Sequence, residues 1–113
     1  MQVIFESPEP DGAQLRKLVE RRVRFVMRRL TWLVPRVRVH LSDVNGQRGG
    51  MDKRCQVELM TDSAGSVVIS SMARNWRSAL AYALARAAQV LKHNLQRVRT
   101  KQRASLPLLR LDS

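Results

Sequence analysis

The sequence is poor in the features that mark secreted and membrane proteins. Its single cysteine, Cys55, cannot form an internal disulfide, and its place in a predicted strand favours a small core residue over a nucleophile. No apolar run approaches the roughly 20 residues that cross a bilayer. Residues 1–10 carry acids where a signal peptide has a basic and then an apolar segment. We therefore expect a cytoplasmic protein.

Acidic residues are also scarce. The chain has 9 Asp and Glu against 21 Lys and Arg, which gives a formal net charge of +12. A field of this sign and size attracts polyanions, although it says nothing by itself about the fold. Nucleic acid is the leading class of partner, and an anionic membrane surface is the second.

Glycine and proline are too few for a low-complexity or disordered chain. With 5 Gly, 4 Pro and 44% hydrophobic residues in 113, the composition is that of one globular domain. A chain of this length buries roughly 65% of its unfolded surface in a single core. No internal repeat is present. We expect one domain over residues 1–103 and a Leu-rich tail over 104–113, which either packs on its own domain or contacts another copy or a partner.

Residues 75–103 predict one long basic helix, around which the other segments can be placed. Asn75 is a suitable N-cap, and no Gly or Pro interrupts the segment. No Asp or Glu lies between Asp62 and Asp112, so the basic residues of this helix have no acidic partner within it. Its apolar residues recur every three or four positions, which predicts one buried stripe: Trp76, Ala79, Leu80, Ala83, Leu84, Ala87, Leu91 and Val98.

Residues 12–33 predict a second helix. Asp11 and Gln14 are spaced as a capping box, and Pro35 prevents the helix from continuing. The predicted buried line is Leu15, Val19, Val26, Leu30 and Leu33, flanked by Leu18 and Val23. The opposite side carries Lys17, Arg21, Arg24 and Arg28, which gives a strongly basic face.

Four segments predict strands. Residues 2–6 are short and rich in Val, Ile and Phe, and residues 36–42 and 54–59 alternate apolar and polar residues with a period of two. Residues 67–72 follow a turn as the last strand. Glycine-rich residues 45–50 predict a mobile hairpin loop, and residues 62–65 predict a turn. The expected class is α+β in the order β-α-β-β-β-α, with a four-stranded mixed sheet and both helices packed on one face.

This order and charge, with short motifs in both helices, resemble the ribosome hibernation-promoting factor family, ribosome-associated inhibitors that bind the small subunit. Leu15-Arg16 followed by Val19-Glu20-Arg21-Arg22-Val23 is similar to the family's first helix. In the second helix the similar positions are Leu80, Leu84, Arg86 and Leu91-Lys92-His93. The resemblance covers residues 1–101. It is to a divergent member, since the aromatic residue after the cap is shifted by one position at Trp76. The chain resembles the short class, because it has no counterpart of the C-terminal dimerisation domain of the long-form members.

The resemblance implies a function that needs no covalent chemistry. The basic helices would occupy the mRNA and tRNA channel of the small subunit, contact ribosomal RNA and silence translation in hibernation or stress. Arginine suits such phosphate contacts, which read shape more than base sequence. The candidate RNA-binding residues are Lys17, Arg21, Arg22, Arg24, Arg28, Arg86, Lys92, His93, Arg97 and Arg99.

Other interpretations remain open. A general module for structured or double-stranded RNA explains the charge equally well, and a protein-interaction subunit could dock through the Leu-rich tail. An enzyme is disfavoured, because the glycines lie between strands without the Lys-Ser/Thr of a phosphate loop. His40 and His93 lack metal-ligand spacing, so we expect no metal or cofactor. We expect Trp76 in the core, leave Arg38 and His40 on the open side of the sheet undecided, and find no indication of a homo-oligomer.

Overall fold

The computed structural model describes the backbone of residues 1–9, 12–44, 52–62 and 65–111. The elements follow one another as β1 (Gln2–Glu6), α1 (Gly12–Val26), β2 (Arg36–Asp43), β3 (Lys53–Met60), β4 (Ser66–Ala73) and α2 (Trp76–Leu111). The predicted glycine-rich loop and the predicted cap Asp11 lie outside these residues. Within them, the order β-α-β-β-β-α is the predicted one.

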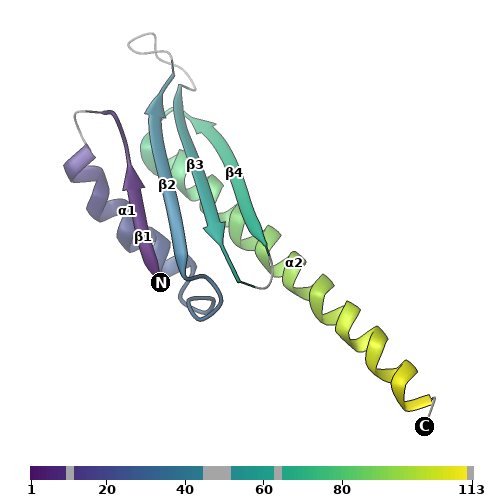
Figure 1. Ribbon diagram of the computed structural model, residues 1–113. Coiled ribbons are helices and arrows are strands. Elements are labelled where there is room, and N and C mark those ends of the chain that lie inside the picture. The colour runs from purple at the N-terminus through teal and green to yellow at the C-terminus, as the bar shows by residue number, and fades with distance from the viewer. Residues whose placement is uncertain (10–11, 45–51, 63–64, 112–113) are drawn as a thin grey trace.

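The four strands form one mixed sheet in the order β1-β2-β3-β4. β1 pairs with β2 in parallel, whereas β2 with β3 and β3 with β4 are antiparallel. Both helices cover the same face of this sheet (Figure 1). The α+β class and the two-layer architecture are therefore confirmed.

The period of two in the strands sorts their side chains between the layers. Val39, Val57 and Leu59 point to the helices and have no exposed surface, and their neighbours in the strands point to the open face. Cys55 lies in the same buried layer, where burial raises the pKa of its thiol to about 12. Cys55 is thus the small core residue that the sequence predicts.

Helix α1 is shorter than predicted. It ends at Val26, and residues 27–33 continue as tight turns in which Leu30 N donates to Met27 O and Leu33 N to Leu30 O. This spacing of three brings Met27, Leu30 and Leu33 onto the core. The predicted buried line is wrong at one position, because it passes through Val23 and Met27 while Val26 is only partly buried.

Helix α2 begins as predicted and ends later. Asn75 Oδ1 accepts a hydrogen bond from Ser78 N at 2.8 Å, which confirms the N-cap. The buried stripe runs to Leu91, after which no described side chain of the helix is buried. The helix nevertheless continues past residue 103 to Leu111, beyond the edge of the sheet (Figure 1). Part of the segment predicted as a tail therefore has helical backbone.

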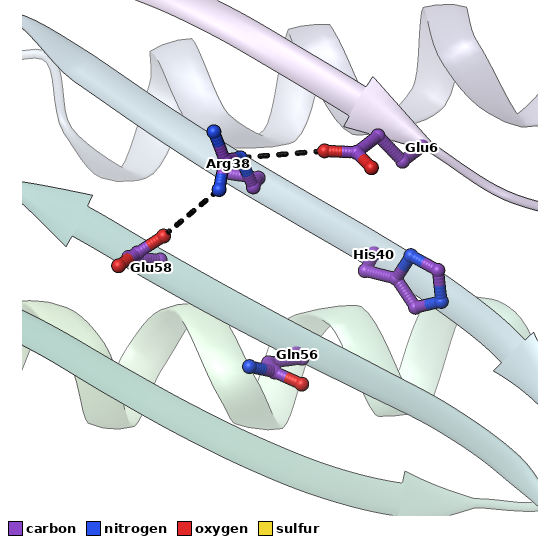
Figure 2. A pocket seen from close by; sticks show the side chains of 5 residues that line it. All are labelled: Glu6, Arg38, His40, Gln56 and Glu58. Atoms are coloured by element: carbon purple, nitrogen blue, oxygen red, sulfur yellow. Dashed lines mark ion pairs between the residues drawn. The ribbon is translucent and has the colours of Figure 1, made fainter.

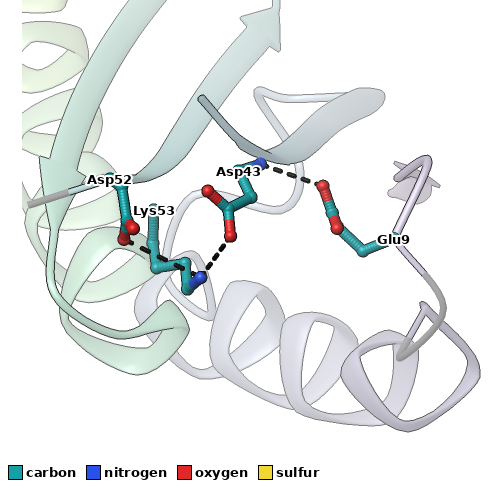
Figure 3. A network of polar contacts seen from close by, with 4 residues as sticks. All are labelled: Glu9, Asp43, Asp52 and Lys53. Carbon is teal, nitrogen blue, oxygen red and sulfur yellow. Dashed lines mark hydrogen bonds and ion pairs between the residues drawn. The ribbon is translucent and has the colours of Figure 1, made fainter. Parts of the chain in front are cut away.

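A polar network ties the start of β3 to its surroundings (Figure 3). Lys53 Nζ lies 2.5 Å from Asp43 Oδ2 and 3.7 Å from Asp52 Oδ1, and Asp43 N donates to Glu9 Oε1 at 3.0 Å. The hydrogen bond to Asp43 raises the pKa of Lys53. The same ammonium group lies 5.3 Å from the ring centroid of Trp76, at the first residue of α2. The network thus joins the end of β2 to the loop before α1 and to the start of α2.

Candidate nucleic-acid interface

The outer face of α1 carries a line of basic side chains. The four residues of this line are all exposed: Lys17, Arg21 and Arg24 lie on α1, and Arg28 lies in the turn that follows it. Their spacing of three and four places them on one side. That side is opposite to the one on which Val19 is buried. Arg22 is also exposed, but it lies about 130° around the helix from this line, beside the buried stripe. We call these five residues the α1 basic face.

Most of the α1 basic face has no acidic partner. Arg24 Nη2 lies 3.4 Å from Glu20 Oε1, in a pair whose two side chains are about half exposed. Such surface pairs contribute little to stability. Lys17, Arg21 and Arg22 make no ion pair with any residue that the structure describes. Their charge is therefore available to an anion outside the chain.

The basic residues of α2 form two rows. Arg86, His93 and Arg97 follow one side of the helix, whereas Lys92 and Arg99 follow another, about 120° away at 100° per residue. All five are exposed. They make no ion pair within the described part of the chain. We call them the α2 basic rows.

The two helices present these charges from one layer. α1 and α2 contact each other, and both lie on the same face of the sheet (Figure 1). Arg86 lies where α2 still covers the sheet, whereas Lys92 and the residues after it follow the last buried residue, Leu91. The ten predicted site residues are thus all exposed on the helix layer, and four of them follow Leu91, the last buried residue of α2.

The acidic side chains are concentrated elsewhere. Of the acids that the structure describes, Glu20 is the one that lies on a helix; the others are on strands or in the connections around them. On the open face of the sheet, Arg38 lies 3.3 Å from Glu6 and 3.5 Å from Glu58 (Figure 2). The helix layer is therefore the more positive of the two faces.

The open face around Arg38 is a shallow hollow of about 310 Å³. Glu6, Arg38, His40, Gln56 and Glu58 line it, and they come from β1, β2 and β3 (Figure 2). Because two carboxylates already neutralise Arg38, this residue is a poor candidate for phosphate binding. Arg38 is one of the two positions that the sequence left undecided, and these ion pairs count against it as a phosphate contact.

Three exposed aromatic side chains are absent from the predicted site. Phe25 is 62% exposed, Trp32 70% and Tyr82 62%. Trp76, the aromatic residue that the sequence singled out, is partly buried against the core. Phe25 does not continue the helical spacing of Val19 and Val23, so it falls off the predicted buried line. That position in the sequence could have identified Phe25 as a surface residue.

Comparisons with known proteins show likeness at the level of the fold. No family model matches the sequence, and no curated protein matches it. A solved structure, the N-terminal domain of Protein Y from Thermus thermophilus, matches with a TM-score of 0.60 and 18% identity. The match covers 81% of this chain and 93% of that domain. Among the described residues, no helix is both long and apolar enough to cross a membrane.

Proposed function

We propose that this chain is a ribosome-associated RNA-binding protein that occupies the mRNA and tRNA channel of the small subunit and silences translation in the cytoplasm. The observation that carries the proposal is the charge of the helix layer. Nine of the ten predicted RNA-binding residues lack an ion pair within the described chain, and one acid, Glu20, lies beside them. A polyphosphate surface supplies the missing counter-charge.

Two further observations support the proposal. The motifs of both helices resemble the ribosome hibernation-promoting factor family, and the fold matches that of the Protein Y domain. The resemblance of the helices rests on residue identities, and the match to the Protein Y domain rests on backbone geometry. The match in structure supports the family resemblance at the level of the fold.

Binding would act through rigid placement of charge. The sheet holds α1 and α2 in a fixed relation, because each helix buries an apolar stripe on it. Guanidinium groups such as those of Arg21 and Arg86 can contact phosphates in bidentate fashion. Contacts of this kind position the protein on the shape of folded RNA. Inhibition then follows from occupancy, and no bond is made or broken.

A general module for structured RNA is the second candidate function. The same exposed cations favour it, because phosphate contacts alone do not distinguish ribosomal RNA from another folded RNA. Competition separates the two. A protein that occupies the channel competes with tRNA and mRNA for the small subunit, whereas a general module binds elsewhere on the subunit as well and leaves both ligands in place.

Co-sedimentation with small subunits tests the proposed surface. We expect the wild-type protein to move with the subunit, and a variant with Arg21, Arg28, Arg86 and Lys92 changed to Glu to stay at the top of the gradient. Circular dichroism of the variant controls for folding, which exposed residues should not affect. Co-sedimentation of the folded variant at wild-type affinity would contradict the assignment of the helix layer.

A further inference from the structure

Two exposed aromatic rings and two arginines gather where α1 gives way to β2. Phe25 and Trp32 are 62% and 70% exposed, and Arg28 and Arg29 between them are exposed as well. The segment lies beside the N-terminus at one end of the sheet (Figure 1). We call these four residues the aromatic platform. It is separate from the α2 basic rows and shares only Arg28 with the α1 basic face.

The backbone of this segment explains why the rings point outward. Hydrogen bonds from Leu30 to Met27 and from Leu33 to Leu30 give about three residues per turn, so residues three apart share a side. Met27, Leu30 and Leu33 form the inner side and are buried. The outer residues pair in the same way, Phe25 with Arg28 and Arg29 with Trp32. With three residues per turn, these two pairs lie on the two sides that flank the buried one, about 120° apart. Each exposed ring therefore has one arginine beside it.

Local contacts hold both rings in place. The Arg28 guanidinium carbon lies 4.4 Å from the Phe25 ring centroid, and Arg28 Nη1 donates to Phe25 O at 2.7 Å. The indole Nε1 of Trp32 donates to Arg29 O at 3.2 Å. Because the one polar atom of Trp32 is already bonded, what the ring offers to a ligand is its apolar face. Ordering these rings on binding would cost little entropy.

The aromatic platform also lies in a strongly positive stretch. No acid occurs between Glu20 and Asp43, whereas seven arginines occur from Arg21 to Arg38. The chain has only two Phe, two Trp and one Tyr, and the buried core cluster contains none of them. Exposed rings beside guanidinium groups that make no ion pair with any described residue suit a ligand that combines flat apolar faces with negative charge. Single-stranded nucleic acid has both.

We propose that the aromatic platform binds unpaired nucleobases of single-stranded RNA, which stack on Trp32 and on Phe25 while Arg28 and Arg29 contact the flanking phosphates. The proposal rests on the proposed function in so far as RNA is the partner. It adds a contact that phosphate binding alone does not provide. Stacking tolerates any base, so the platform would favour single strands over duplexes without reading sequence.

Trp32 fluorescence with short RNAs tests this directly. In a Trp76→Phe protein, Trp32 is the one remaining tryptophan, and we expect single-stranded oligouridylate or oligoadenylate to quench it strongly. The added change Phe25→Ala/Trp32→Ala should weaken binding of the single strands, followed by fluorescence anisotropy, by roughly tenfold or more. A blunt RNA duplex should bind that variant within about twofold of the parent. Trp32→Phe alone, which keeps a ring, should retain most of the single-strand affinity.

The salt dependence separates stacking from phosphate contacts. Phe25→Ala/Trp32→Ala should lower affinity at every salt concentration and leave the slope of log affinity against log salt unchanged, whereas Arg28→Gln/Arg29→Gln should make the slope shallower. Tyr82→Ala is the matched control, since Tyr82 is as exposed as Phe25 but has no arginine over its ring within the described residues. Its single-strand affinity should remain that of the parent protein.

Two results would overturn the aromatic platform: no change in Trp32 emission at saturating single strand, or an equal loss of duplex and single-strand binding in Phe25→Ala/Trp32→Ala. A protein that binds small subunits yet shows either result keeps the proposed function and loses the platform. A protein whose Trp32 is quenched by single strands, but which does not bind small subunits, keeps the platform and loses the ribosomal assignment.

Discussion

Lys53 and Asp43 face each other across the antiparallel pair β2–β3, and their charged atoms lie 2.5 Å apart (Figure 3). The same lysine contacts Asp52, which is 2% exposed, and the ring of Trp76. The pair therefore lies where β2 and β3 approach the start of α2. Its effect on stability can be followed by pH.

The hydrogen bond to Asp43 raises the pKa of Lys53 above 10.5 in the folded chain. The stabilisation is therefore complete below pH 10.5, the unfolded value, and is lost as the pH rises through the higher folded value. We expect the urea midpoint of the wild-type protein to fall more steeply above pH 10.5 than that of Lys53→Met. Lys17→Met, which removes an exposed lysine without an acidic partner among the described residues, should follow the wild type. Parallel curves for all three proteins would contradict the role of Lys53.

The N-cap of α2 should contribute measurably to stability. Asn75→Ala removes the acceptor for Ser78 N and should lower the free energy of unfolding by about 1 kcal/mol. Asn75→Asp keeps an acceptor at the same place and should stay near the wild type. Equilibrium urea unfolding measures both, and equal destabilisation by the two changes would show that the cap is not what Asn75 provides.

The end of α2 should be dispensable for RNA binding. Removal of residues 106–113 leaves every proposed contact in place, because the α1 basic face and the α2 basic rows end at Arg99. The shortened protein should bind small subunits as the wild type does. With about six phosphates neutralised, log affinity should still fall with log salt at a slope of about −4 to −5. A large loss of affinity, or a nearly flat salt dependence, would favour docking through the Leu-rich end.

Alternation along the strands made most of the fold predictable. Val37, Val39 and Leu41 recur every second residue, and this pattern alone places them on the buried face of β2. The cap at Asn75 followed in the same way from a short side chain before an uninterrupted helical pattern. Local sequence was sufficient at these positions because tertiary contacts and local preference agree.

The C-terminal ends of both helices were not predictable from local sequence. Residues 27–33 carry helix formers, yet their backbone hydrogen bonds join residues three apart. This tighter spacing buries Met27, Leu30 and Leu33 together. At the other end, α2 continues through Pro107 to Leu111, although proline removes a backbone donor and usually disfavours helix. The first departure accompanies packing on the core, which no short pattern encodes.

The candidate site was predictable in its charges but not in its rings. Every predicted basic residue is exposed, because basic residues opposite an apolar stripe have no place in a core. Phe25 and Trp32 belong to the residue types that usually fill cores. Phe25 lies off the buried line of α1, whereas Trp32 faces outward because of the tight turns that follow α1. That the basic residues bind RNA remains a prediction.

A matched pair of charge-reversal variants tests the central claim, that the helix layer is the surface that meets RNA. Arg21→Glu/Arg86→Glu changes the helix layer, and Arg36→Glu/Arg54→Glu changes exposed residues of the sheet strands. All four arginines lack an ion pair within the described chain, and both variants lower the net charge equally. Long-range attraction therefore weakens to the same extent in each. We predict that small-subunit affinity falls at least tenfold further in the first variant than in the second; equal losses, or a greater loss in the second, would contradict the account.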